Sequence, residues 1–76
     1  MTQRKQRIFY VTSSDRKGEP VPTLARSIEG AQRSAQEKFG VGKSTVLYVI
    51  HIEDNVRTVY EKKYRQQWQF SYREAL

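Results

Sequence analysis

The clearest pattern in the sequence is helical, and it covers residues 27–39. Four apolar residues recur there at spacings of three, four and four, which places them on one face of a helix: Ile28, Ala31, Ala35 and Phe39. Ser27 is a good N-cap, Glu29 lies where the helix dipole favours an anion, and Gly40 can adopt the left-handed conformation that ends a helix. Because this apolar face is narrow and partly alanine, we expect the helix to pack closely on a sheet.

A hairpin with a long, charged loop is expected before this helix. Residues 7–14 are rich in aromatic and β-branched residues, and residues 21–26 resume an extended pattern after the turn-forming residues 15–18. Pro20 and Pro22 lack a donor N–H, so the second of these strands is expected at a sheet edge.

A second hairpin is expected after the helix. Residues 45–53 are apolar on both faces of a strand, which predicts a central strand covered at least partly on each side. Asp54-Asn55 fits a short turn, and residues 56–60 are again β-prone. A two-residue turn sets two pairs opposite each other: Ile50 with Val59, and Val49 with Tyr60.

The last third of the chain fits two periodicities. Five aromatic residues occupy even positions, which is typical of a strand: Tyr60, Tyr64, Trp68, Phe70 and Tyr72. Four of them are also four residues apart, and the Glu, Lys, Arg and Gln between them are good helix formers. We expect a strand to about Tyr64, followed by helical or irregular structure to Leu76.

These elements predict one α+β domain, with an antiparallel sheet of three or four strands, the order ββαββ, and the helix across one face. Residues 1–7 are expected to be a flexible basic arm, residues 8–64 the folded domain, and residues 65–76 a basic and aromatic segment. The chain has no cysteine, so its hydrophobic core must hold the fold without disulfides. The expected core is Phe9, Val11, Leu24, Ile28, Ala31, Ala35, Phe39, Val46, Tyr48, Ile50, Ile52 and Val59.

The formal net charge of +6 is concentrated towards the two ends of the chain. Residues 1–7 carry a net +3, residues 8–55 are neutral, and residues 56–73 carry a net +4. Charge concentrated in this way attracts polyanions or acidic protein surfaces, although a charged surface also keeps a small protein soluble.

Few residues of the chain could support catalysis or bind a metal. Gly42-Lys43-Ser44 resembles the end of a phosphate-binding loop, but position 37 is Glu where that motif needs Gly, and the helix precedes instead of following. His51 is the only histidine, no cysteine can join it in a zinc site, and its neighbours do not form a catalytic triad. We therefore expect a protein that is not an enzyme and that uses no metal, cofactor or small-molecule substrate.

The C-terminal segment combines aromatic and basic side chains, which together hold single-stranded nucleic acid by base stacking and phosphate contacts. The candidate residues for binding nucleic acid or a partner are Arg57, Lys62, Lys63, Arg65 and Trp68, helped by Arg4, Lys5 and Arg7 of the basic arm. The alternative is that the aromatic residues are core and the basic residues their solvated face, with Tyr60 buried and Trp68 and Phe70 more exposed. Exposed Trp and Phe would equally suit a protein interface.

Residues 10–53 resemble the small RNA-polymerase inhibitor proteins of T-odd coliphages. The resemblance is carried by Val11, Ser13-Ser14, Val21-Pro22, Ala25, Ala31 and Ala35, in matching order around a strand–strand–helix–strand plan. It implies a phage or mobile-element protein that binds the host polymerase stoichiometrically and blocks promoter opening, and it assigns no site residues.

The sequence therefore predicts a small basic regulatory protein that binds nucleic acid, DNA or RNA, through its C-terminal surface. One alternative is a stoichiometric inhibitor of a host enzyme such as bacterial RNA polymerase, and another is an accessory subunit whose C-terminal tail folds on its partner. The longest apolar run covers only residues 46–50, and the N-terminus lacks the apolar stretch of a secretory signal. We expect a cytoplasmic protein with no membrane partner.

Overall fold

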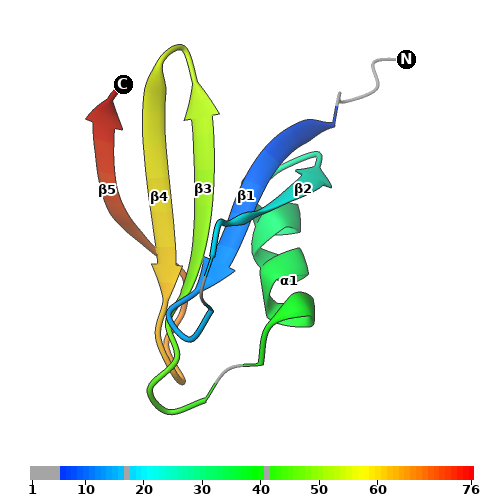
Figure 1. Ribbon diagram of the computed structural model, residues 1–76, viewed down its shortest axis with the longest axis vertical. Helices are drawn as coiled ribbons and strands as arrows, with labels where there is room; N and C mark the ends of the chain where they lie inside the picture. Colours follow the sequence, from blue (N-terminus) through cyan, green and yellow to red (C-terminus); the bar gives the residue numbers. More distant parts are fainter. Residues whose placement is uncertain (1–5, 17, 41) are drawn as a thin grey trace.

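The computed structural model of the chain describes residues 6–16, 18–40 and 42–76. Its elements in chain order are β1 (Arg7–Ser13), β2 (Val21–Ala25), α1 (Ile28–Lys38), β3 (Leu47–Glu53), β4 (Val56–Lys62) and β5 (Gln69–Ala75). The strands form one antiparallel sheet in the order β2-β1-β3-β4-β5, and α1 packs on one side of it, against β1, β2 and β3 (Figure 1). The predicted α+β class is confirmed, but the order is ββαβββ instead of ββαββ, because the sheet has five strands instead of three or four.

Helix α1 begins as the sequence predicts and ends differently. Gly30 donates its backbone N–H to the hydroxyl oxygen of Ser27 over 3.2 Å, which satisfies one of the donors left unpaired at a helix start. At the other end Phe39 is extended, with φ −123°, and its N–H donates to the carbonyl of Ala35. The left-handed conformation expected at Gly40 is not adopted, since Gly18 is the one described glycine with positive φ. Within the described ranges, no helix has the length and apolar character needed to cross a bilayer.

The core lies between α1 and the face of the sheet that α1 covers. Its fully buried large side chains are Phe9 and Val11 of β1 and Leu47 and Val49 of β3. Ala31 and Ala35 of α1 are 0% exposed, so the helix backbone approaches the sheet closely, as the small residues predict. Ile28 and Phe39 are partly buried against this core.

Several residues of β3 and β2 that were expected in the core lie on the face of the sheet that α1 does not cover, which corrects that expectation. Tyr48, Ile50 and Ile52 alternate with the buried Leu47 and Val49 and so point away from α1, and Val46 precedes the strand and is only partly buried. On β2, Thr23 and Ala25 are buried while Leu24 is 61% exposed. Because residues 45–53 are apolar at both odd and even positions, their alternation could not identify the covered face.

The sheet therefore has a second face that no other element of the described chain covers, here called the open face. Cross-strand partners in an antiparallel sheet share a face, and the register places on this one Ile8, Tyr10, Thr12, Pro22, Leu24, Tyr48, Ile50, Ile52, Arg57, Val59, Glu61, Gln69, Tyr72 and Glu74. The expected cover of the central strand, at least partly on each side, is not provided by another element on this face, although Tyr48 and Ile50 are half-buried among their neighbours.

The predicted register of the β3–β4 hairpin is confirmed. Ile50 pairs with Val59 and Val49 with Tyr60. The turn residues Asp54 and Asn55 both have positive φ, at 53° and 62°, which is the geometry of a type I′ turn. This turn matches the twist of the two strands and fixes their register. The edge position expected for β2, from its prolines, is also confirmed.

The C-terminal residues form a fifth strand, which corrects the expectation of helical or irregular structure. The period-two alternation was the right signal for residues 69–75, which pair with β4 as β5. The pairing shifts by one residue between Val59 and Tyr60, because Val59 faces Tyr72 and Tyr60 faces Phe70, leaving Ser71 as a β-bulge. Leu76 then donates its N–H to the carbonyl of Asn55 over 2.8 Å, which ties the end of the chain to the β3–β4 turn.

Replacement of Ala35 by Leu tests the close contact between helix and sheet. Ala35 is fully buried, so Ala35→Leu is expected to lower the free energy of unfolding by about 1–3 kcal/mol through overpacking. Glu37→Leu, at an exposed position of the same helix, is the matched control and should change it by no more than about 0.5 kcal/mol. Urea unfolding measures both, and equal effects of the two changes would contradict this packing.

Candidate functional site

The residues expected to bind a partner lie in separate places on the structure. Arg57 is on the open face, where its guanidinium Nη1 lies 2.6 Å from Glu74 Oε1 on the neighbouring strand. Its charge is therefore matched by a carboxylate, and its side chain points away from the face that α1 covers. Arg57 does not join the other candidate residues.

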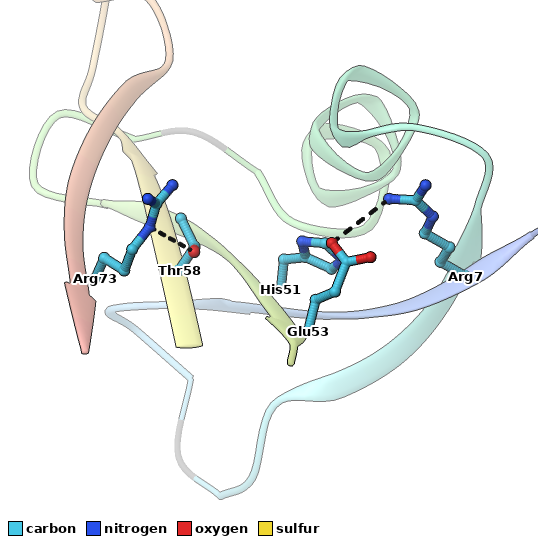
Figure 2. Close-up of polar contacts among 5 residues, drawn as sticks. All are labelled: Arg7, His51, Glu53, Thr58 and Arg73. Atoms are coloured by element: carbon cyan, nitrogen blue, oxygen red, sulfur yellow. Dashed lines mark hydrogen bonds and ion pairs between the residues drawn. The ribbon is translucent and has the colours of Figure 1, made fainter. Parts of the chain in front are cut away.

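Arg7 lies at the end of the sheet where β1 begins, opposite the end that holds the β4–β5 turn (Figure 1). Its Nη1 is 4.0 Å from Glu53 Oε2, and His51 Nε2 is 3.9 Å from the same oxygen (Figure 2). His51 in turn stacks on the ring of Phe9, with 4.8 Å between ring centroids. Arg7 thus belongs to a polar cluster with His51 and Glu53, which is separate from the other candidate residues. The other two arm residues predicted to bind, Arg4 and Lys5, lie outside the described residues.

Three of the predicted cations do come together, at the β4–β5 turn. Lys62 ends β4, and Lys63 and Arg65 lie in the turn that follows. Gln66 ties this turn closed, since its N–H donates to the carbonyl of Lys63 over 3.1 Å and its own carbonyl accepts from Lys62 Nζ. Arg65 has a φ of 59°, a left-handed conformation unusual for a residue with a side chain, and its guanidinium lies 5.3 Å from the ring centroid of Tyr64.

These three cations differ from Arg7 and Arg57 in their partners. Each of the three ion pairs that the described residues form uses Glu53 or Glu74, both at the far end of the sheet. Among the residues that the structure describes, no carboxylate therefore forms an ion pair with Lys62, Lys63 or Arg65. A turn with three uncompensated cations produces a positive potential at this end of the molecule.

A hollow lies beside this turn, between α1 and the β4–β5 hairpin, and is here called the hairpin groove. Its lining residues are Ile28, Glu29, Gln32 and Gln36 from α1, and Tyr60, Lys62, Gln66, Gln67, Trp68 and Phe70 from the hairpin. The indole N–H of Trp68 donates to Gln36 Oε1 over 3.0 Å, so the ring is held in place from the helix side. Trp68 also packs partly against the core, whereas Phe70 is 57% exposed.

The bulge at Ser71 brings a further cation to the aromatic side chains of the groove. Phe70 and Arg73 are three residues apart, so a regular strand would place them on opposite faces. The extra residue puts both on the face covered by α1, where Arg73 lies 6.0 Å from the Phe70 ring centroid and donates to Thr58 Oγ1 over 3.3 Å (Figure 2). Phe70 itself makes an edge-to-face contact with Tyr60, with 6.2 Å between centroids.

The sequence prediction grouped Lys62, Lys63, Arg65 and Trp68, which lie near one another in the structure, but it did not include three further residues of the same surface. Phe70 was expected to be exposed yet was not assigned to the site, and its period-two position could have placed it there. Gln36 could not be found from the sequence, because its contact with Trp68 spans 32 residues. The position of Arg73 beside Phe70 depends on the bulge at Ser71, and no pattern in the sequence indicates that bulge.

The arrangement offers ammonium, guanidinium, amide and aromatic groups to a ligand. Cations bind phosphates, amides hydrogen-bond to polar edges, and aromatic faces stack on flat rings. Within residues 6–16, 18–40 and 42–76, no three side chains of His, Asp or Glu gather as ligands for a metal ion. The groove also contains one carboxylate, Glu29, and its cationic and aromatic groups can contact an anionic ligand that carries flat rings.

The left-handed conformation of Arg65 predicts an unusual order of stability between two substitutions. Arg65→Gly and Arg65→Ala both remove the guanidinium, but glycine adopts positive φ without the clash of a Cβ atom. The glycine variant is expected to be more stable than the alanine variant by about 1 kcal/mol. At Lys63, whose φ is not positive, the order should reverse, with alanine about 0.4–1 kcal/mol more stable. Thermal unfolding of the four variants checks this, and the same order at both positions would contradict the turn geometry.

No protein-family model matches the chain, and no curated protein or solved structure shows significant similarity to it.

Proposed function

We propose that the chain is a non-catalytic regulatory protein that binds single-stranded nucleic acid, DNA or RNA, in the hairpin groove and on the β4–β5 turn. The observation that carries the proposal is the grouping of three uncompensated cations, Lys62, Lys63 and Arg65, beside the aromatic rings of Trp68 and Phe70. Arg7 and Arg57, the other two candidate residues within the described chain, each lie beside a carboxylate.

The two kinds of side chain account for the two parts of a nucleotide. Lysine and arginine neutralise phosphates, and an aromatic face stacks on a base with about 1–3 kcal/mol per base. The ring of Trp68 is oriented by its hydrogen bond to Gln36 before any ligand binds, which lowers the entropy cost of stacking. The remaining amide groups of the groove, on Gln32, Gln66 and Gln67, can donate to and accept from base edges.

The groove favours a single strand over a duplex. Stacking on Trp68 or Phe70 requires a base whose face is exposed, and bases inside a duplex are already stacked on one another. Because phosphate contacts release counterions, the affinity should also fall as salt is added.

A second candidate function is stoichiometric inhibition of a host enzyme, with bacterial RNA polymerase as one example. It is favoured by the 57% exposure of Phe70, which lies in the groove with Trp68 and beside Arg73, because aromatic residues and arginine are the usual anchors of protein interfaces. This function predicts a stable complex with one host protein in a pull-down from nuclease-treated lysate. If no single host protein is enriched there, this second function loses its support.

The charges of the β4–β5 turn provide the direct test of nucleic-acid binding. Fluorescence anisotropy with labelled single-stranded and duplex oligonucleotides, across about 50 to 300 mM salt, gives both the affinity and its salt dependence. The triple variant Lys62→Ala, Lys63→Ala, Arg65→Ala is expected to bind more weakly. Its slope of log K against log salt should be smaller by about 2, since about 0.7 of a counterion is released for each phosphate contact of a single strand.

The matched control removes the same charge from the other end of the sheet. Arg7→Ala, Arg26→Ala, Arg57→Ala lowers the net charge equally but leaves the hairpin groove unchanged, so it should weaken binding much less. Trp68 is the only tryptophan of the chain, so its fluorescence should be quenched on binding in both triple variants at saturation. Equal loss of affinity in the two triple variants, or unchanged Trp68 emission on binding, would place the contact elsewhere.

A further inference from the structure

The open face carries bulky apolar side chains that nothing in the described chain covers. Leu24 is 61% exposed, Ile8 53%, Tyr72 47% and Ile52 41%. One row of direct cross-strand partners crosses all five strands and is formed by Pro22, Tyr10, Ile50, Val59 and Tyr72. Pro22 and Tyr72 are exposed, Tyr10 and Ile50 are half-buried, and Val59 is buried among its neighbours. A group of exposed bulky apolar side chains on one face of a sheet is unusual for a monomer and marks a site of association.

The charge of this face is very different from that of the whole chain. The strand residues that point to it include three side chains that are charged at pH 7, Arg57, Glu61 and Glu74, and the first and last of these form an ion pair of 2.6 Å. The face therefore has a local charge near −1, although the chain as a whole has +6. Because each open face carries a local charge near −1, two open faces repel each other only weakly.

We propose that the open face packs against the open face of a second copy of this chain, which gives a two-fold symmetric dimer with both α1 helices on the outside. A two-fold axis places the same residues opposite each other, so a nearly neutral, apolar face is complementary to itself. A strongly acidic partner, by contrast, would be attracted to the turn at Lys62, Lys63 and Arg65 and not to this face.

The size of the face agrees with this occupant. Five strands about 4.8 Å apart and seven residues of about 3.3 Å each span a flat area of about 500 Å². The accessible area is larger than this flat area because side chains project from the sheet. It therefore approaches the roughly 800 Å² per partner of a standard stable interface. Two sheets that pack face to face lie about 10 Å apart and interdigitate their side chains, as in a β-sandwich.

The edges of the sheet are less suitable for pairing with a second copy. β2 contains Pro22, which cannot donate to a neighbouring strand, and β5 contains the bulge at Ser71 followed by the charged Arg73. Proline, bulges and charges are the features that prevent edge strands from pairing. The face, and not an edge, is therefore the surface for self-association. Because the hairpin groove lies on the other side of the sheet, it stays accessible in the dimer, and the proposal does not depend on what the groove binds.

Sedimentation velocity of the full chain over a range of concentrations tests the dimer. The monomer mass is 9.0 kDa, so the expected species at high concentration has twice that mass, 18.0 kDa. Leu24→Lys and Ile52→Lys each place a cation on the open face at an exposed position and are expected to give the 9.0 kDa monomer at the same concentrations. Leu76→Lys is the matched control, since Leu76 is equally exposed, at 61%, but follows the last strand, and this variant should remain dimeric.

Circular dichroism of each variant confirms that it is folded before its mass is interpreted. A wild-type chain that stays monomeric at every concentration would overturn the proposal. So would dimers that persist in both folded open-face variants, because these would place the interface at an edge or on the helix side. Species that grow beyond a dimer would also overturn it, since face-to-face packing closes at two copies.

Discussion

Helix α1 covers only part of a sheet that is much wider than the helix. An α-helix with its side chains is about 10–12 Å across, whereas five strands span about 24 Å. Ala31 and Ala35 allow α1 to settle closely over Phe9, Val11, Leu47 and Val49, and this contact forms the only large core of the described chain. Two surfaces stay uncovered as a result: the β4–β5 half of the sheet on the helix side, and the whole open face.

The uncovered half on the helix side has the properties of a binding surface. Trp68 donates a hydrogen bond to Gln36 and lines the hairpin groove. The bulge at Ser71 places Arg73 on the same face as Phe70. The turn that carries Lys62, Lys63 and Arg65 includes a residue in a left-handed conformation, which costs about 1–3 kcal/mol for a residue with a Cβ atom. Backbone strain of this kind is often found at functional sites, so the strained turn agrees with the proposed role.

The fold was predictable wherever a local signal had one structural meaning. Ser27 specified the helix start, and Asp54-Asn55 specified both the hairpin and its register. Residues 45–53 were predicted as a strand, but both of its faces are apolar, so the covered face was not predictable. The even spacing of Tyr60, Tyr64, Trp68 and Tyr72 fits a helix as well as a strand, which is why β5 was missed. Lys62, Lys63, Arg65 and Trp68 share one hairpin end and were found together. Arg57 was grouped with them because sequence proximity does not reveal the face on which a strand residue lies.

Binding in the hairpin groove can be tested by mapping the contact surface with ¹⁵N-resolved NMR during titration with an unlabelled single-stranded oligonucleotide. At about 150 mM salt, non-specific attraction is screened beyond about 8 Å. We expect shifts of the backbone amides of residues 62–70, the indole N–H of Trp68 and the side-chain amide of Gln36. The amides of Leu24 and Ile52 on the open face should not move. Shifts that are confined to the open-face residues, or no shifts at saturating oligonucleotide, would contradict the assignment of the hairpin groove as the binding site.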